Sequence, residues 1–463
     1  MKAKGEGTGR KETTINRRNF VKRTAGTATA FMIVPRHVLG GQGNTPPSDK
    51  LNIASIGAGG MARADIKGCS SENIVALCDV DWTRAAESFQ DYPKAARYKD
   101  FRLMLEKEEK NIDAVIVGTP DHTHAVAAMT AIKAGKHVYC EKPLCKTIYE
   151  TQRLMEAARE AKVATQMGNQ GHSSEGMKLM CEWIWDGALG PIREVDVWTT
   201  HPVWPQGLDR PKETPPVPDT LDWDLWLGPA FSRPYHPAYV PALWRGWWDF
   251  GTGGLGDMAC HNLDPVVSAL KLGHPTSVEA SNSIFVGDWS WDKKMNYESY
   301  PQASIVRYHF PAREEMPAVA VTWYDGGLLP ERPEELEAGI PMGNKMGGAI
   351  FKGEKGKLIC ESHSGAPQLI PPSFNRSYQK PPKSLPRVEG HHQEWIQACK
   401  NGTQPSSNFE VAGLLTQIAL LGNVALHATL GKRYLWDPIN TRIANDEKAN
   451  SLLHYEYRKG WSL

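Results

Sequence analysis

Short apolar runs alternate with amphipathic segments from residue 51 onward. Between these runs, residues 123–134 and 149–161 repeat apolar positions with the period of a helix. The runs themselves have the length of buried strands and fall at residues 51–56, 73–78, 113–117, 137–140 and 163–166. Regular alternation of strands and helices is typical of a doubly wound sheet of parallel strands. The pattern therefore predicts an α/β fold for this part of the chain.

The rhythm changes after about residue 190. Strand-like runs then follow without regular helices between them, at residues 192–201, 276–286, 302–310 and 317–324. This predicts a second α/β domain with a mainly antiparallel, open sheet. Residues 202–250 are rich in Pro and Trp and are expected to form loops over the cleft of the first domain. Residues 409–430 are expected to form a helix near the end of the chain.

Charge and cysteine usage exclude several classes of protein. The formal net charge is +1, from 53 basic and 52 acidic side chains, which argues against nucleic acid as the main partner. No segment approaches the roughly 18 uninterrupted apolar residues of a membrane span. The eight cysteines form no C-x-x-C pair, which argues against zinc-ribbon and thioredoxin-like motifs. Several lie in apolar runs and are expected to be small buried side chains.

An arginine pair marks the N-terminus. Arg17 and Arg18 precede Phe20, and a mildly apolar run rich in Ala, Thr and Gly follows. This arrangement resembles a twin-arginine export signal; a disordered basic tail is the alternative. The export signal predicts a protein that folds and loads its cofactor before it reaches the periplasm or another extracytoplasmic space. Such a protein needs no disulfides even in an oxidising compartment.

A glycine-rich turn follows the first predicted strand, in the pattern G-x-G-x-x-G/A. Gly57 allows a tight turn, Gly59 lets the backbone approach a pyrophosphate, and Ala62 keeps the following helix close to the strand. Met61 lies within the same turn. The second predicted strand ends at Asp79, where a carboxylate accepts hydrogen bonds from ribose hydroxyls and would repel a 2′-phosphate. The motif therefore predicts NAD as cofactor, in preference to NADP.

Other polar residues follow the ends of later strands, at Thr119, Pro120, Glu141, Lys142 and Asn169. Because the carboxyl ends of parallel strands share one edge of the sheet, one cleft can hold these residues together with the nucleotide. A lysine in that cleft could polarise an alcohol or carbonyl oxygen and favour a developing alkoxide. A surface lysine at a turn is the alternative for Lys142.

The stretch GGLGDMACHNLDP, residues 253–265, gathers four potentially reactive side chains after three glycines. Asp257 and His261 are four residues apart and therefore share one face of a helix, away from Cys260. An aspartate one turn before a histidine can orient the imidazole while it accepts a hydroxyl proton. From the stretch alone, an ordinary structural helix, an acid–base pair and a metal site all remain open.

The ordered motifs resemble those of the Gfo/Idh/MocA oxidoreductase family over nearly all of residues 50–463. They are GAGGMA (57–62), TPDHTHA (119–125), EKPL (141–144), GNQGH (168–172) and GGLGDMACHNLDP (253–265). The resemblance implies an N-terminal Rossmann domain, NAD(P) as cofactor, and oxidation or reduction of sugars, inositols and related polyols. It also implies that the sheet of the C-terminal domain forms contacts between subunits of a homo-oligomer.

The resemblance assigns roles to individual residues. Lys142 matches the catalytic lysine of the EKP motif, and Asp257 and His261 match the D-x-x-x-H pair, with the histidine as proton acceptor. Asn169 matches an asparagine near the nicotinamide. With these matches the acid–base pair becomes the favoured interpretation of residues 253–265, and no metal site is expected. Residues 202–250 depart from the family pattern, which leaves the substrate open.

The chain is thus predicted to have an export signal and linker (1–49), an NAD-binding Rossmann domain (50–171) and a C-terminal substrate-binding and oligomerisation domain (172–463). Candidate contacts to sugar hydroxyls are His172, His201, Arg245 and Trp248, each with a structural role as the alternative. His122 and His124 are expected to cap their helix or line the cleft rather than bind a metal.

Three functions remain for comparison. The first is an exported oxidoreductase that moves a hydride between a sugar or polyol hydroxyl carbon and tightly bound NAD. The second is a glycoside hydrolase in which bound NAD transiently oxidises the sugar so that the aglycone leaves by elimination. The third is a non-catalytic sugar sensor, against which the joint presence of Lys142, Asp257 and His261 speaks.

Overall fold

The computed structural model describes residues 49–284 and 296–463, and the predicted export signal lies outside these ranges. Residues Leu51–Leu463 form a single unit by their internal contacts, and the description below concerns this unit.

The first sheet has six parallel strands in the order β3-β2-β1-β4-β5-β6. This order reverses between β1 and β4, which creates the crevice in which such sheets bind dinucleotides. The predicted parallel Rossmann sheet is therefore confirmed. Its strands are β1 (Asn52–Ile56), β2 (Asn73–Cys78), β3 (Ala96–Tyr98), β4 (Ala114–Val117), β5 (His137–Glu141) and β6 (Thr165–Gly168).

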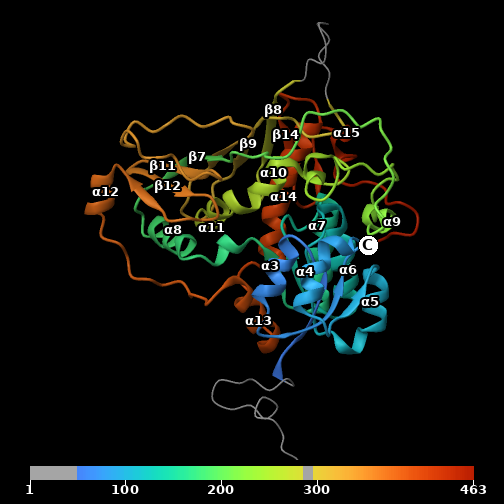
Figure 1. Ribbon diagram of the computed structural model, residues 1–463. Helices are drawn as coiled ribbons and strands as arrows, with labels where there is room; N and C mark the ends of the chain where they lie inside the picture. The colour runs from blue at the N-terminus through green and yellow to red at the C-terminus, as the bar shows by residue number, and fades with distance from the viewer. Residues whose placement is uncertain (1–48, 285–295) are drawn as a thin grey trace, which may run out of the picture. The chain divides into compact units, whose positions relative to one another are not determined.

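Helices cover both faces of this sheet (Figure 1). Apolar residues on one face pack with α5 (Phe101–Lys107), α6 (Asp121–Lys133) and α7 (Ile148–Ala161). The other face packs with α3 (Met61–Gly68), α4 (Trp82–Asp91) and α13 (His391–Asn401). Trp395 of α13 is fully buried there, so a helix from late in the chain returns to cover the first sheet.

The second sheet has nine strands in the order β13-β12-β11-β7-β10-β9-β8-β14-β15. Only β7 and β10 pair in parallel, so the predicted mainly antiparallel sheet is confirmed. Four of its strands were expected from the sequence: β7 (Ile192–Trp198), β8 (Ser277–Asn282), β9 (Ser304–Phe310) and β10 (Val319–Tyr324). The others are β11 (Gly348–Gly353), β12 (Gly356–Glu361), β13 (Gln368–Ile370), β14 (Tyr434–Asp437) and β15 (Arg442–Ile443).

Helix α14 (Phe409–His427) joins the two sheets. It packs against α7, β6, β8 and α10 (Gly253–Asn262), and its residues belong to the same apolar core as both sheets. Among the described helices, α14 alone has the length and hydropathy of a membrane-crossing helix, but 83% of that stretch is buried within the protein. The eight cysteines are all buried and free, as the apolar runs predicted.

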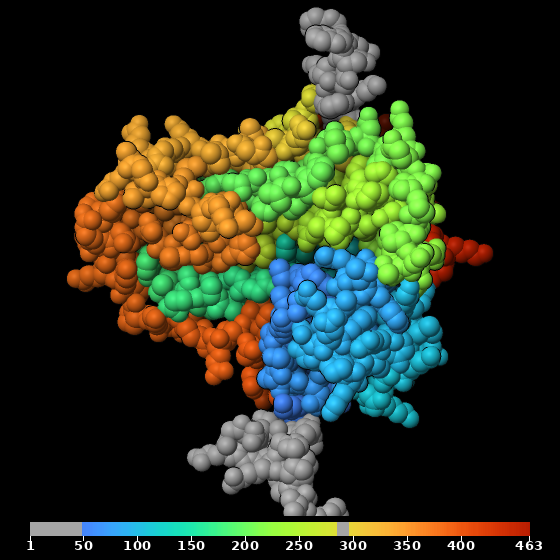
Figure 2. All heavy atoms as spheres, viewed as in Figure 1, coloured from blue at the N-terminus to red at the C-terminus, as the bar shows by residue number. Residues whose placement is uncertain are grey.

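The Trp-rich segment 202–250 lies at the carboxyl end of β2, beside Asp79. Backbone hydrogen bonds join Asp222 N to Val80 O (2.9 Å) and Trp82 N to Thr220 O (3.3 Å). The segment has its own apolar cluster, which includes the buried Trp226, Trp244 and Phe250. In Figure 2 the yellow-green surface of this segment rests directly on the blue surface of the first sheet and its helices. The expected loops over the cleft are confirmed.

Candidate active site

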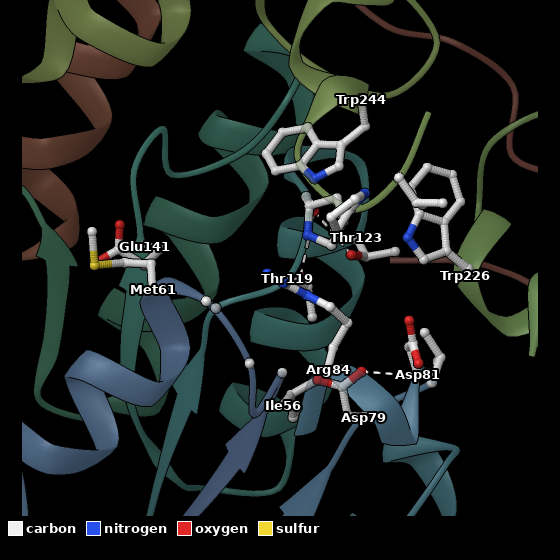
Figure 3. A pocket seen from close by; sticks show the side chains of 18 of the residues that line it. Ile56, Met61, Asp79, Asp81, Arg84, Thr119, Thr123, Glu141, Trp226 and Trp244 are labelled. Carbon is white, nitrogen blue, oxygen red and sulfur yellow. Dashed lines mark hydrogen bonds between the residues drawn. The ribbon is translucent and has the colours of Figure 1, made fainter. Parts of the chain in front are cut away.

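A cavity of about 410 Å³ lies at the carboxyl ends of β1, β2, β4 and β5. On one side it is bounded by the glycine turn and Asp79, and on the other by Trp226 and Trp244 of segment 202–250 (Figure 3). Lys142 and Arg245 are among the charged residues that line it. The cavity therefore continues from the nucleotide-binding turn of the sheet to Lys142, which was predicted to be catalytic, and Arg245, which was predicted to contact sugar hydroxyls.

The glycine turn has the geometry that a bound pyrophosphate needs. Gly57 adopts a φ of 89°, and a methyl group there would lie 2.6 Å from the carbonyl oxygen of Gly118. Gly59 and Met61 line the cavity, with Met61 half exposed at its rim. Ala62 is buried and does not line the cavity; it packs so closely on Gly118 that a side chain at 118 would clash. Ala62 thus sets the spacing between helix and strand, as expected from the motif.

Asp79 is held in place by the backbone of its own turn. Its Oδ2 accepts from Ala58 N at 2.8 Å and its Oδ1 accepts from Asp81 N at 2.9 Å. Burial raises the pKa of Asp79, although these backbone N–H groups oppose the change. The side chain faces the cavity at the position where a ribose would lie, so the residues present fit a dinucleotide (Figure 3).

Lys142, which lines the cavity, meets Asp257 of α10. The Lys142 ammonium donates to Asp257 Oδ1 at 2.8 Å and to the Asp257 carbonyl oxygen at 2.9 Å. Arg245 Nε donates to the same Oδ1 at 3.1 Å. Burial opposes ionisation of Asp257, but the charges of Lys142 and Arg245 outweigh it and hold the pKa of this carboxyl below its usual range. One carboxylate thus anchors two cations that both line the cavity.

The structure corrects the expected partner of Asp257. Asp257 and His261 share one face of α10 as predicted, but the hydrogen bonds of Asp257 go to Lys142 and Arg245, not to His261. The physical reason is charge, because a cation is a stronger partner for a carboxylate than a neutral imidazole is. His261 Nδ1 is buried and has no hydrogen-bond partner among the described residues. Burial and the Lys142 charge lower the pKa of His261 well below its usual range, so the imidazole is neutral.

Asn169 and His172 belong to a buried network beside the cavity. Asn169 Nδ2 donates to Asp264 Oδ2 at 2.9 Å, and Asn169 Oδ1 accepts from Ser407 Oγ at 2.6 Å. His172 Nδ1 pairs with Asp264 Oδ1 at 2.9 Å. Neither amide nor imidazole lines the cavity described above, so their contacts to nicotinamide and sugar remain predictions. Asp264, for which no chemical role was expected, anchors both residues.

Of the other residues predicted to contact substrate, some lie close to Lys142 and Asp257 and one does not. His201 lies near Lys142, Asp257 and Arg245, whose charges act on it, and burial lowers its pKa. Trp248 packs against Tyr300 with ring centroids 3.6 Å apart and planes inclined by 31°, and it does not line the cavity. Arg245 and His201 therefore lie in the predicted chemical region, whereas Trp248 packs beside it.

His122 and His124 lie in the first turn of α6 and are fully buried. His122 contacts the carbonyl oxygens of Trp226 and Phe250, and His124 contacts those of Thr119 and Pro143. His124 also lines the cavity. Within residues 49–284 and 296–463, no group of three or more His, Cys, Asp or Glu side chains is arranged to hold a metal ion.

Two residues of this region were missed in the sequence. Asp121 lines the cavity, accepts from Thr252 Oγ1 at 2.6 Å, and has its pKa raised to about 7 by burial. It follows Thr119 and Pro120 directly, so the strand-end argument could have included it. His363 stacks on His261 with ring centroids 3.9 Å apart. No local motif marks His363, because it lies in a turn of the second sheet.

Comparison with known proteins agrees with this geometry. A family model described as "Oxidoreductase family, NAD-binding Rossmann fold" matches residues 51–169. A second one, described as "Oxidoreductase family, C-terminal alpha/beta domain", matches residues 198–288. Both domains expected from the motifs are therefore present in the expected order. These two segments of the chain match the models of the Gfo/Idh/MocA oxidoreductase family.

Curated sugar and inositol dehydrogenases are similar to the chain at low identity. Levoglucosan dehydrogenase of Pseudarthrobacter phenanthrenivorans is 26% identical over 252 residues, which are 51% of this chain and 55% of that protein. Myo-inositol 2-dehydrogenase of Thermotoga maritima is 26% identical over 157 residues, 34% of this chain and 46% of that protein. The chain thus matches about half the length of these curated relatives.

Solved structures of dehydrogenases share the fold. An inositol dehydrogenase homolog from Azotobacter vinelandii, complexed with NADH and myo-inositol, superposes with a TM-score of 0.55 at 18% identity. The superposition covers 84% of this chain and 98% of that one. At this identity the likeness establishes the fold and not the substrate.

Proposed function

We propose that this protein is an NAD-dependent oxidoreductase that moves a hydride between a hydroxyl-bearing carbon of a sugar, sugar derivative or polyol and tightly bound nicotinamide. The single observation that carries this proposal is the Lys142–Asp257 pair, whose lysine lines the dinucleotide cavity. NAD, when bound, supplies the hydride acceptor. The Asp79 turn described above favours NAD over NADP, because its fixed carboxylate opposes a 2′-phosphate.

The protein's own side chains supply charge stabilisation and proton transfer. The Lys142 ammonium and the Arg245 guanidinium, held by Asp257, stabilise negative charge that develops on the substrate oxygen. His261 accepts the hydroxyl proton, for which a neutral imidazole is required. Because these groups are mostly buried, their charges act through little water and are weakly screened.

Tight retention of the cofactor is supported by the cover over the cavity. Trp226 and Trp244 form its outer wall, and segment 202–250 is fixed to the Asp79 turn through backbone hydrogen bonds. The C-terminal tail adds to this, since Arg458 donates to the carbonyl oxygens of Asp224 and Gly228. An enzyme that works outside the cytoplasm needs such retention, because little free NAD is available there.

We also propose export by the twin-arginine route and assembly into a homo-oligomer through the second sheet. The sequence around Arg17 and Arg18 supports the first. Alternating burial along β9 and β10, which leaves one face partly exposed, supports the second. Cell fractionation of the wild type and of an R17K/R18K variant tests the export proposal. Light scattering after size-exclusion chromatography tests the assembly.

The experiment that tests the activity uses protein as purified. Nucleotide released by denaturation is identified by mass spectrometry, before and after exposure to sugars, inositols and aryl glycosides without added NAD. Bound NAD that becomes reduced while a keto-sugar forms supports the proposal. Release of aglycone without net reduction identifies the glycoside hydrolase instead. Protein that binds sugar and leaves both nucleotide and sugar unchanged contradicts both enzymatic functions.

A further inference from the structure

The ring of His261 needs a constraint that no hydrogen bond provides. Asp257 is committed to Lys142 and Arg245, and His261 Nδ1 has no partner among the described residues. The side chain is nevertheless buried, and the charges of Lys142 and Asp257 act on it. A proton acceptor in a catalytic site must keep its orientation, so another contact has to hold the imidazole.

The closest ring to His261 is that of His363. Their centroids are 3.9 Å apart and their planes are inclined by 23°, which is a stacked arrangement. The His363 ring is itself fixed, because its Nδ1 lies 2.7 Å from Ser362 Oγ, and Ser362 Oγ in turn donates to Asn262 Oδ1 at 2.6 Å. Asn262 directly follows His261 on α10, so the two rings are fastened to adjoining parts of the structure.

The backbone that carries His363 is strained. His363 and Ser364 have φ angles of 63° and 55°, a region that residues other than glycine seldom adopt. Two successive residues in this region cost free energy that the surrounding structure must supply. Such strain is concentrated at functional sites, where it fixes a side chain that an unstrained turn would place elsewhere.

The strained turn packs closely against two glycines of the segment that follows β6. A methyl group at Gly171 would lie 2.5 Å from the His363 carbonyl oxygen, and one at Gly176 would lie 2.2 Å from that of Ser364. Both positions therefore allow the turn to approach as closely as it does. The contact joins the second sheet to the end of the first, so His363 is placed by both parts of the fold.

We propose that His363 is a positioning residue that orients the His261 imidazole by stacking. The inference rests on the proposed function for its catalytic consequence, but the stacking itself does not depend on any substrate. The titratable groups that face His261 are Lys142, Asp257, His201 and His363. Of these, His363 alone contributes a ring face to it in the described structure.

The first test needs no substrate. Histidine is labelled with ¹⁵N in the full chain with its nucleotide, and the His261 signal is assigned by its loss in H261Q. We expect the His261 resonances to move in H363A, where the ring face is lost. In H363F the ring face remains but the positive charge that His363 can carry is gone, so His261 should titrate at a higher pH than in the wild type. Unchanged His261 resonances in H363A would overturn the proposal.

The second test separates positioning from simple structural support. H363A should lower kcat by about 10–100-fold with a smaller change in KM, and H363F should restore most of kcat while its acid limb moves to higher pH. H363F as inactive as H363A would overturn the proposal. The first test does not depend on turnover. If the His261 resonances move in H363A but the wild type oxidises no sugar, the positioning role of His363 stands and the proposed function is rejected.

Relief of strain supplies a matched control. H363G and S364G each replace one residue of the strained turn with glycine, which adopts a positive φ without steric cost. Only H363G removes the ring, so only H363G should lower kcat. An H363G variant with undiminished kcat would show that the strained turn serves no function through its histidine.

Discussion

The Lys142 ammonium lies 2.8 Å from the Asp257 carboxylate and 2.9 Å from the carbonyl oxygen of the same residue. This double contact fixes the lysine in the lining of the cavity and, through the shared Oδ1, ties it to Arg245. The arrangement places two cations and one carboxylate together, so positive charge is left over for a developing alkoxide.

Removal of either partner should therefore damage catalysis strongly. We expect K142M and D257N each to lower kcat by about 10²–10³-fold, because K142M removes the stabilising cation and D257N leaves two mostly buried cations without their counter-charge. The double variant should lose much less than the product of the two effects, since both changes break one unit. Steady-state kinetics on the four proteins give the coupling. Fully multiplicative losses would show that the two residues act independently.

Asp79 should control both affinity and choice of nucleotide. D79A removes the acceptor for Ala58 N and Asp81 N and the expected acceptor for the ribose hydroxyls. We expect NAD to bind about 10–100-fold more weakly, in line with the loss of charged hydrogen bonds, whereas NADP should bind no worse than before. Calorimetric titration of protein stripped of nucleotide measures the dissociation constants of NAD and of NADP. Equal weakening of NAD and NADP would argue that Asp79 only shapes the turn.

Asp121 predicts a dependence of stability on pH. Its folded pKa of about 7 lies above the ordinary value of 3.8 because of burial, so the folded protein holds a proton that the unfolded chain releases. The resulting stability is fully present below pH 3.8 and is lost as the pH rises through about 7. D121N keeps an acceptor for Thr252 and cannot ionise.

The unfolding free energies of wild type and D121N, measured by denaturant titration across this window, test the assignment. The wild type should lose stability relative to D121N as the pH rises, and the difference should stop growing above about pH 7. A constant difference between the two proteins would place the ionisation of Asp121 outside this range.

The C-terminal tail should slow release of the cofactor. Arg458 Nη2 donates to Asp224 O at 2.7 Å and Arg458 Nε to Gly228 O at 3.1 Å, which fastens the segment that contributes Trp226 to the cavity wall. We expect R458A to speed NADH release several-fold, as followed by nucleotide fluorescence after dilution into excess NAD. R442A breaks a surface ion pair with Glu447 and should leave the release rate unchanged. Equal rates in R458A and wild type would refute this role for the tail.

The sequence predicted the parts of the fold that local pattern determines. The strands β1, β2, β4 and β5 follow apolar runs, and Gly57 and Asp79 stand where the nucleotide motif requires. The strands β11 to β15 were missed. The apolar runs in β11, β12 and β14 are only three residues long, too short to be told from other buried segments without their neighbours in the sheet.

In the candidate site, too, the sequence predicted what local spacing determines and missed what depends on distant segments. Helical spacing was sufficient to place Asp257 and His261 on one face, but not to show that the carboxylate would bind Lys142, which comes from a distant strand end. His363 could not be predicted, since its place depends on a strained turn that packs on Gly171. Asp264 was set aside for the same reason, because its partners Asn169 and His172 come from another segment.

The central claim is that hydride passes directly between a sugar or polyol carbon and bound nicotinamide beside Lys142. The most direct measurement uses protein as purified and a substrate from the panel that carries deuterium on its hydroxyl-bearing carbons, followed by mass spectrometry of the nucleotide released on denaturation. The account predicts reduced nucleotide that carries one added deuterium in the wild type and far less of it in K142M. Reduced nucleotide without deuterium, or the same yield in K142M, would contradict it.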